Sequence, residues 1–240
     1  MRICLLAFIT VISVYQLIPN IYARHFDDRV HHSIEASGHE IALTFDDGPD
    51  QTYTPQLLDL LKAENIHATF FLVAERAQTH PEIVKRMINE GHAIGLHSLS
   101  HRGFWLETPR QTRLDFKESI DIFHSLDVDL IGFRPPWGTF NLLTSHYANQ
   151  ADLPIYLWTR NAKDWKIESS ANDIVERISD HLADGEIIVL HDAGGDNGAP
   201  SHTIQALRQA LPQLKKEFTF VTIEKGSKRH ELDTKKVPSS

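Results

Sequence analysis

Two adjacent carboxylates end the first β-rich run of the chain in a form suited to acid–base chemistry. Asp46 and Asp47 follow the run Glu40–Phe45 and precede Gly48 and Pro49. Adjacent side chains of a regular strand point to opposite faces, but the Gly-Pro pair turns the chain at once, so both carboxylates can reach one rim. One could hold a metal ion while the other acts as a general base. An Asx-type turn or a helix cap is the alternative interpretation.

Two histidines four residues apart follow another short apolar run, Ala93–Leu96. Residues i and i+4 share one face of a helical turn, so His97 and His101 could share one ion. Ser98 excludes the HExxH pattern of zinc proteases, and a pair of surface histidines is the alternative interpretation. With Asp47 the histidines would form a His, His, Asp set, which leaves positions open for water and substrate as a catalytic zinc site requires.

Three further strand-like runs also end in polar or aromatic residues. The segments are Phe133–Gly138, Asn161–Trp165 and Ile187–Asp192. The last is an apolar strand that carries His191 at its end, and a single histidine of this kind is more often structural than catalytic. Together with the two motifs above, five strands end in this way, which is hard to attribute to chance. The carboxyl ends of the strands are also where β/α barrel enzymes keep their active sites.

Strand and helix patterns alternate through most of the chain, from near His39 onward. The expected strands are Glu40–Phe45, Ala68–Val73, Ala93–Leu96, Leu130–Arg134, Pro154–Trp158, Glu186–Leu190 and Thr219–Ile223. The expected helices are Thr54–Glu64, Pro81–Glu90, Thr108–Leu126, Leu142–Gln150, Ala171–Ala183 and Ser201–Lys216. About seven strands separated by helices predict a parallel sheet with helices outside, either closed into a barrel or doubly wound.

Composition limits the possible partners and metal ligands. The 240 residues carry a formal net charge of −8, which argues against a role in binding nucleic acid or anionic lipid through broad electrostatic attraction. A single cysteine, Cys4, excludes a disulfide framework and a zinc site built from several thiolates. The 15 histidines are an unusually high number, and imidazole is the commonest metal ligand. Any metal site should therefore use nitrogen and oxygen ligands.

The N-terminus has the pattern of a targeting segment. Residues 3–19 form an apolar run without a charged side chain, which predicts that residues 1–23 are a signal peptide or an N-terminal membrane anchor. A buried N-terminal helix is the alternative. Residues 24–38 are polar and without period and are expected to be a linker, and residues 227–240 are expected to form a disordered tail. The chain should therefore be extracytoplasmic, either secreted or held at a membrane by residues 3–19.

The polar strand ends, taken together, resemble the motifs of a known family. The motifs TFDDGP, HSLSH, RPPWG, NAKDW and IVLHD, in this order between Thr44 and Asp192, are similar to the five motifs of the polysaccharide deacetylases, or NodB homology domain. The resemblance implies one domain over residues 39–226, with a distorted (β/α) barrel of about seven parallel strands and outer helices. It also implies metal-dependent hydrolysis of N-acetyl, sometimes O-acetyl, groups on chitin, peptidoglycan and related glycans.

The same resemblance implies a role for each motif residue. Asp46 would be the general base, oriented by Arg134, and His191 the general acid, oriented by Asp164. The metal ligands would be Asp47, His97 and His101. The substrate would lie against Trp137, Trp165 and Pro136, with the backbone N–H of Trp137 helping to bind the oxyanion. One divalent ion is expected, zinc foremost, with cobalt, nickel or manganese as alternatives.

Two positions depart from the family pattern. Asn161 stands where many members carry Asp, and Leu96 where Asn is common. Neither is a ligand, acid or base in the implied mechanism, so the departures bear on which glycan is bound. We expect an exported deacetylase of an N-acetylated cell-wall or extracellular glycan, with no nucleic-acid partner and membrane contact only through the N-terminal segment. The alternatives are a metal-dependent hydrolase of another non-peptide C–N bond and a non-catalytic glycan-binding module.

Overall fold

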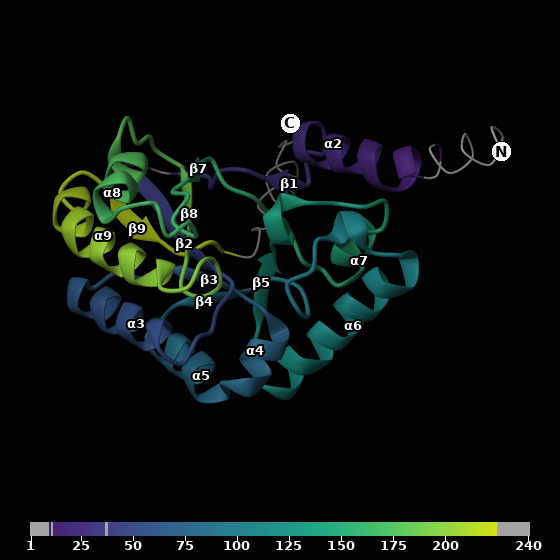
Figure 1. Cartoon of the computed structure of the whole chain (residues 1–240), viewed down its shortest axis with the longest axis horizontal. Helices are drawn as coiled ribbons and strands as arrows, with labels where there is room; N and C mark the ends of the chain where they lie inside the picture. Colours follow the sequence, from purple (N-terminus) through teal and green to yellow (C-terminus); the bar gives the residue numbers. More distant parts are fainter. Residues whose placement is uncertain (1–9, 11, 37, 225–240) are drawn as a thin grey trace, which may run out of the picture.

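One curled parallel sheet forms the centre of the protein. The computed structural model describes residues 10, 12–36 and 38–224. Nine strands pair in the order β1-β6-β5-β4-β3-β2-β8-β7, with β9 also paired to β2. All ladders between these strands are parallel. Helices cover the outside of the sheet (Figure 1), so the expected distorted (β/α) barrel with outer helices in one domain is confirmed.

The elements follow one another in βα alternation. The strands are β1 (Val30–His31), β2 (Glu40–Asp46), β3 (Thr69–Leu72), β4 (Ala93–Leu96), β5 (Leu130–Phe133), β6 (Ile155–Tyr156), β7 (Arg160–Asn161), β8 (Ile187–His191) and β9 (Thr219–Val221). The α-helices are α2 (Ile18–His25), α3 (Tyr53–Glu64), α4 (Ala74–Thr79), α5 (Pro81–Asn89), α6 (Pro109–Ser125), α7 (Thr144–Gln150), α8 (Ala171–Ser179) and α9 (Ala199–Leu214). Short turns of other helix types are η1 (Ser13–Leu17), η2 (Phe104–Leu106) and η3 (Pro136–Gly138).

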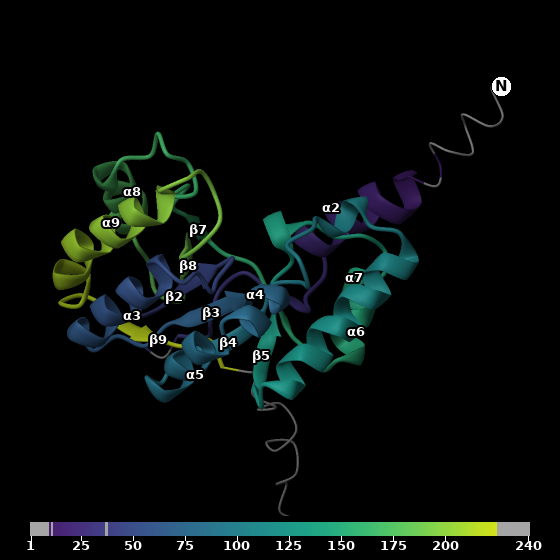
Figure 2. The same cartoon turned by 60° about the horizontal axis from the view of Figure 1, so that its bottom comes forward.

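The core lies between the sheet and the outer helices. β2 is buried along all but its first residue, as expected of a strand covered on both faces. Helix α3 buries Leu57, Leu58 and Leu61 against this core, a spacing of three and four residues that places them on one face. Helices α8 and α9 lie at one end of the molecule and α6 and α7 at the other, in both views (Figures 1 and 2).

The register of the central strands brings distant motifs together. In the β2–β8 ladder, Asp46 aligns with His191. In the β4–β5 ladder, Leu96 aligns with Phe133, so the residues that follow these two strands leave the sheet side by side. Parallel strands end at the same edge of the sheet, and the polar strand ends of the sequence therefore meet at one rim.

The sheet has two short strands more than the sequence predicts. β1 lies within residues 24–38, the expected linker, and pairs with β6. Val30 of β1 is buried, and Ser33 forms an antiparallel bridge with Glu186. The second unexpected strand is β7. A two-residue strand is too short to show a period of two, which is why the pattern of polar and apolar residues did not reveal either one. Regular structure thus begins before His39.

A helical segment, η1 followed by α2, precedes β1. It lies at the margin of the molecule near α7 (Figures 1 and 2). Among the residues that the structure describes, no helix is both long and apolar enough to cross a membrane. The predicted anchor run 3–19 falls partly outside the described residues, and the predicted tail 227–240 falls wholly outside them.

Candidate active site

A cleft of about 580 Å³ opens at the carboxyl ends of the central strands. Seven residues singled out from the sequence motifs line it: Asp46, Asp47, His97, His101, Trp137, Trp165 and His191. Arg134 and Asp164 are fully buried behind the wall and contact two of these residues directly. Pro136 is buried in η3 and does not line the cleft. The structure thus gathers all the motif residues around one cavity, with Pro136 beneath its surface.

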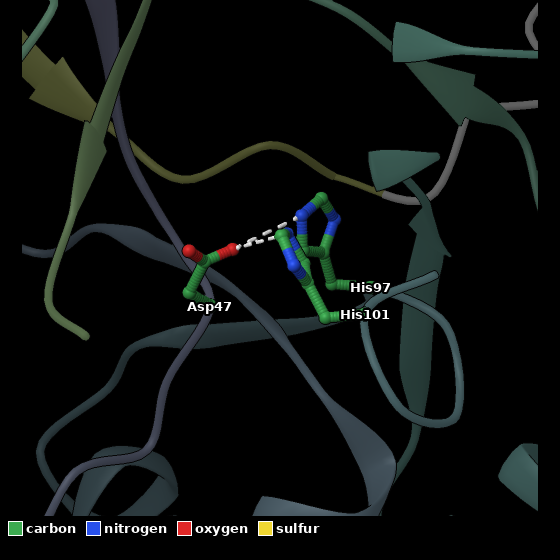
Figure 3. Close-up of side chains that lie close together, drawn as sticks. All are labelled: Asp47, His97 and His101. Carbon is green, nitrogen blue, oxygen red and sulfur yellow. Dashed lines mark ion pairs between the residues drawn. The ribbon is translucent and has the colours of Figure 1, made fainter. Parts of the chain in front are cut away.

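Asp47, His97 and His101 line the cleft and form a compact group, in which both imidazole rings lie near the Asp47 carboxylate (Figure 3). Asp47 Oδ1 lies 2.8 Å from His101 Nε2 and 3.4 Å from His97 Nε2. Each residue offers a ligand atom, and these atoms lie within 4.8 Å of one another. Burial raises the pKa of Asp47, but the two imidazoles outweigh this effect and hold it well below its usual range. A carboxylate and two imidazoles therefore converge at one point.

The side chains of Asp47, His97 and His101 have the donor atoms that a divalent ion requires. Asp47 Oδ1 is buried and accepts no hydrogen bond of good geometry, although two imidazole nitrogens face it. His97 Nδ1 lies 2.7 Å from the carbonyl oxygen of Arg134. Because a carbonyl only accepts hydrogen bonds, Nδ1 carries the proton and the lone pair of Nε2 points toward the group. Imidazole and carboxylate ligands of this kind suit zinc and its neighbours among the transition metals.

The two histidines meet through a loop and not through the helical turn that their spacing suggested. Residues 97–101 have no helical assignment, and Ser98 and His101 have φ angles of 68° and 59°. Ser98 Oγ accepts the His101 backbone N–H at 2.9 Å, and Asp115 Oδ2 accepts the Leu99 N–H at 3.0 Å. Hydrogen bonds inside and beneath the loop, which the spacing of the histidines does not encode, therefore bring the rings together.

Asp46 lies beside this group and has a cationic partner. Arg134 Nη1 donates to Asp46 Oδ1 at 2.6 Å, and the guanidinium also donates to Thr44 Oγ1 and to the Leu157 carbonyl. Burial lowers the pKa of Arg134, and the charge of Asp46 opposes that effect. The second oxygen of Asp46, Oδ2, lies 3.9 Å from His97 Nε2. One oxygen of Asp46 is therefore held in place, while the other faces the cleft.

His191, next to Asp46 on the neighbouring strand, has a carboxylate partner of its own. Its Nδ1 lies 2.8 Å from Asp164 Oδ1, and Asp164 Oδ2 accepts the His191 backbone N–H and the Thr203 hydroxyl. Burial lowers the pKa of His191, but Asp164, with Asp47 and Asp46, raises it to about 9. With Nδ1 bound to Asp164, Nε2 is the nitrogen left to exchange a proton with a molecule in the cleft.

Aromatic rings form the rest of the rim. Trp137 is 59% exposed, and its ring centroid lies 4.5 Å from that of His101. Trp165 stands edge-on to His191 at 5.5 Å. Broad apolar faces beside polar groups are typical of surfaces that bind sugar rings. The two tryptophans thus frame the mouth of the cleft above the polar groups.

Several residues of the cleft escaped the sequence analysis. Arg76, from the unexpected helix α4, lines the cleft and donates through Nη1 to the Asp47 carbonyl at 2.7 Å. Gly194 has a φ of 67°, and a Cβ there would collide with the Asp47 carboxylate, so only glycine fits. The sequence signal for this close approach of the backbone to Asp47 was the pair Gly194 and Gly195 shortly after His191. The surroundings of Arg76 in the sequence carry no comparable signal.

Asp115 yields a prediction about stability and pH. It is buried beneath the loop that carries His97 and His101, where burial raises its pKa from 3.8 to about 8. A carboxyl with a raised pKa binds its proton more tightly in the folded protein, so its stabilising effect is complete below pH 4 and is lost as the pH rises through 8. Between pH 5 and 9 the melting temperature of the wild type should therefore fall further than that of Asp115→Asn. The difference should be on the order of several degrees.

Thermal unfolding of both proteins across this range measures the difference. Asp121→Asn, an exposed carboxyl on the same helix, is the control and should follow the wild type. Equal pH slopes for the wild type and Asp115→Asn would show that Asp115 titrates normally.

Comparison with known proteins agrees with the geometry. The family model described as polysaccharide deacetylase matches residues 33–156. A peptidoglycan-N-acetylglucosamine deacetylase of Bacillus cereus is 38% identical over 190 residues, which are 76% of this chain and 85% of that protein. The crystal structure of a peptidoglycan N-acetylglucosamine deacetylase bound to an N-oxidanyl-benzamide superposes with a TM-score of 0.77 and 32% identity, over 88% of this chain and 98% of that one.

A third match concerns the metal. A family 4 acetyl xylan esterase from Clostridium thermocellum, solved with a cobalt ion, superposes with a TM-score of 0.68 and 34% identity, over 76% of this chain and 87% of that one. Sequence match, fold and motif positions thus point the same way. The chain belongs to the polysaccharide deacetylase family.

Proposed function

We propose that this protein is an exported, metal-dependent deacetylase that hydrolyses N-acetyl groups of a cell-wall glycan, such as the N-acetylglucosamine of peptidoglycan, and releases acetate. One observation carries the proposal. Asp46, held by Arg134, and His191, held by Asp164, lie on adjacent strands and flank the Asp47, His97 and His101 group in one cleft. The relatives act on N-acetylated cell-wall sugars according to their names, which supports the same substrate class here.

Asp47, His97 and His101 are the residues that would hold the divalent ion, zinc foremost. When bound, such an ion polarises an acyl oxygen and stabilises the negative charge that develops on it. Asp47 suits this work because its neighbours keep it ionised, and His97 because its Nδ1 bond fixes the ring. The cobalt ion in the structure of the related xylan esterase agrees with a divalent ion in this family.

Asp46 is the base of the proposed reaction. Its Oδ1 is occupied by Arg134, which leaves Oδ2 to take a proton from the attacking water. The bond to Arg134 also fixes the orientation of the carboxylate. His191 then supplies a proton from Nε2 to the departing amine, which cannot leave readily as an anion. Asp164 keeps His191 protonated at neutral pH and holds its ring.

The tryptophans at the rim of the cleft would bind the sugar ring. Trp137 and Trp165 offer apolar ring faces beside His101 and His191. The backbone N–H of Trp137 would help to hold the oxyanion. Asn161 also lines the cleft, where many family members carry Asp. Its Oδ1 accepts the Lys163 N–H at 2.8 Å, so its role is to shape the loop that carries Asp164 and Trp165.

A substrate panel tests the proposed function. Acetate release should be measured on peptidoglycan, chitooligosaccharides, O-acetylated xylan and a cyclic imide. We expect release from N-acetylated glycans, with peptidoglycan fragments preferred. Hydrolysis of the imide without acetate release from any glycan would replace the proposal with the other C–N hydrolase considered from the sequence. Acetate from xylan alone would identify an esterase.

A further inference from the structure

The N-terminal helical segment, residues 12–26, has a polar face that is docked on the catalytic domain. The carbonyl of Tyr15 accepts the Leu142 N–H at 2.9 Å, and Asn20 Oδ1 accepts the Phe140 N–H at the same distance. Ala23 is buried between the segment and the domain. Phe140 and Leu142 follow η3 directly, and η3 carries Trp137 of the cleft rim. The segment is therefore anchored at the rim through specific polar contacts.

The segment also places a hydroxyl group inside the domain. The hydroxyl of Tyr15 is buried without a hydrogen bond of good geometry, and burial raises its pKa, with Thr112 and Glu107 as its neighbours. Thr112 belongs to α6, which also supplies Asp115 beneath the metal-ligand loop. Without the segment, this buried polar region would be open to water. The two hydrogen bonds from Phe140 and Leu142 to the segment, together with burial of Ala23, are expected of a permanent part of the fold rather than of a leader that is cut off.

The opposite face of the segment is apolar and exposed. Val14, Leu17, Ile18, Ile21 and Tyr22 follow a spacing of three and four residues, which places them on one side of a helix. Of the 13 large apolar side chains exposed among the described residues, seven lie between Ile12 and Phe26. A helix whose polar face is packed inward and whose apolar face points to solvent reverses the usual arrangement. It needs a partner on its outer side.

The chain itself indicates which partner this is. The run directly before the segment, residues 3–11, is uncharged and apolar in sequence, so the exposed stripe continues a stretch that favours hydrocarbon. Leu106 of η2 and Leu142 are also exposed, and both belong to stretches that contact η1. A helix with a large apolar face and a docked polar face suits the plane of a membrane interface. A second copy of the chain would not account for the apolar run that precedes the stripe.

We propose that residues 12–26 are retained as an interfacial helix that inserts Val14, Leu17, Ile18, Ile21 and Tyr22 into a phospholipid bilayer surface while its polar face stays docked at the rim of the cleft. The helix then fixes the cleft close to the membrane in one orientation. Binding to the bilayer does not depend on the proposed deacetylase activity. The consequence that glycan near the membrane is the preferred substrate does rest on the proposed function.

The test uses the full chain with Cys4→Ser and one new cysteine, labelled with an environment-sensitive fluorophore. Ile21→Cys probes the stripe, and Ile88→Cys, on α5 with a similar exposed fraction of 43% against 48%, is the matched control. Vesicles of equal parts phosphatidylglycerol and phosphatidylethanolamine should raise the emission at position 21 several-fold and leave position 88 unchanged. Leu17→Cys repeats the test if Ile21→Cys lowers the melting temperature. Amide exchange should show Phe140 and Leu142 protected in the same vesicle-bound sample.

Three results would overturn the proposal. Vesicle binding without a change at positions 21 and 17 would mean that residues 3–11 alone hold the protein and the segment is a tether. A blue-shifted label in a dimer without vesicles would assign the stripe to a second copy. If the intact mass of the exported protein matches a chain that begins after Ala23, the segment is a cleaved signal. None of these readouts uses enzyme activity, so failure here leaves the proposed deacetylation untouched.

Discussion

Asp47→Ala should lose its divalent ion and its activity together, whereas Asp46→Asn should keep the ion and lose only turnover. The two residues are neighbours in the chain, but Asp47 faces the imidazoles of His97 and His101, and Asp46 is held by Arg134. Loss of one positioned proton-transfer group typically costs about 100-fold to 10,000-fold in rate. Metal content by mass spectrometry and acetate release from one preparation measure both effects.

His101→Ala should behave as Asp47→Ala does, because it removes a ligand atom from the same group. His181→Ala, a histidine that is almost fully exposed outside the cleft, is the control and should retain both metal and activity. Equal loss of metal in Asp46→Asn and Asp47→Ala would show that Asp46 is a ligand and not the base. Full metal content in His101→Ala would disprove the ligand assignment.

His191→Ala should lose about 100-fold to 10,000-fold in turnover with its metal content intact, because the proton donor to the amine is removed. In the wild type the donor must be protonated. The pKa of His191 is raised to about 9, mainly by Asp164 against the effect of burial. Activity should therefore fall as the pH rises through about 9, and this fall should vanish from the residual activity of His191→Ala.

Asp164→Asn separates the positioning role from the chemical one. Removing the carboxylate that raises the pKa of His191 should move the high-pH fall to lower pH, which a purely structural defect would not do. The control is Asp121→Asn, whose carboxyl is remote from the cleft and exposed. A wild-type profile that keeps rising above pH 10 would mean that no protonated side chain assists the leaving amine.

Much of the fold could be predicted because long elements carry their own pattern. The apolar spacing in α3 and the wholly apolar β8 indicated their type and position. The structure adds α4, β1 and β7, which have six, two and two residues. Elements this short are stabilised by tertiary contacts, such as the Val73 N–H to Gly48 carbonyl bond just before α4, and local sequence does not encode those.

The candidate site was visible in the sequence because its residues end strands, and parallel strands end at one rim. The means of bringing them together was not visible. His97 and His101 were expected on a helical turn, yet Ser98 and Asp115 shape a loop that brings the rings together. Asp115 is 16 residues away from Leu99, its partner, so spacing within the HSLSH motif carries no trace of it. Arg76 escaped for the same reason, because α4 was not expected.

The central claim, that this chain removes acetyl groups from a cell-wall glycan with a bound divalent ion, is tested most directly on peptidoglycan. Acetate and new free amines on the glycan should be counted in one reaction, for the protein as purified, after chelation, and after zinc is added back. The account predicts equal amounts of acetate and amine, loss of both on chelation, and recovery with zinc. Acetate release that survives complete removal of the metal, or a zinc-loaded protein that releases none from any N-acetylated glycan, would contradict it.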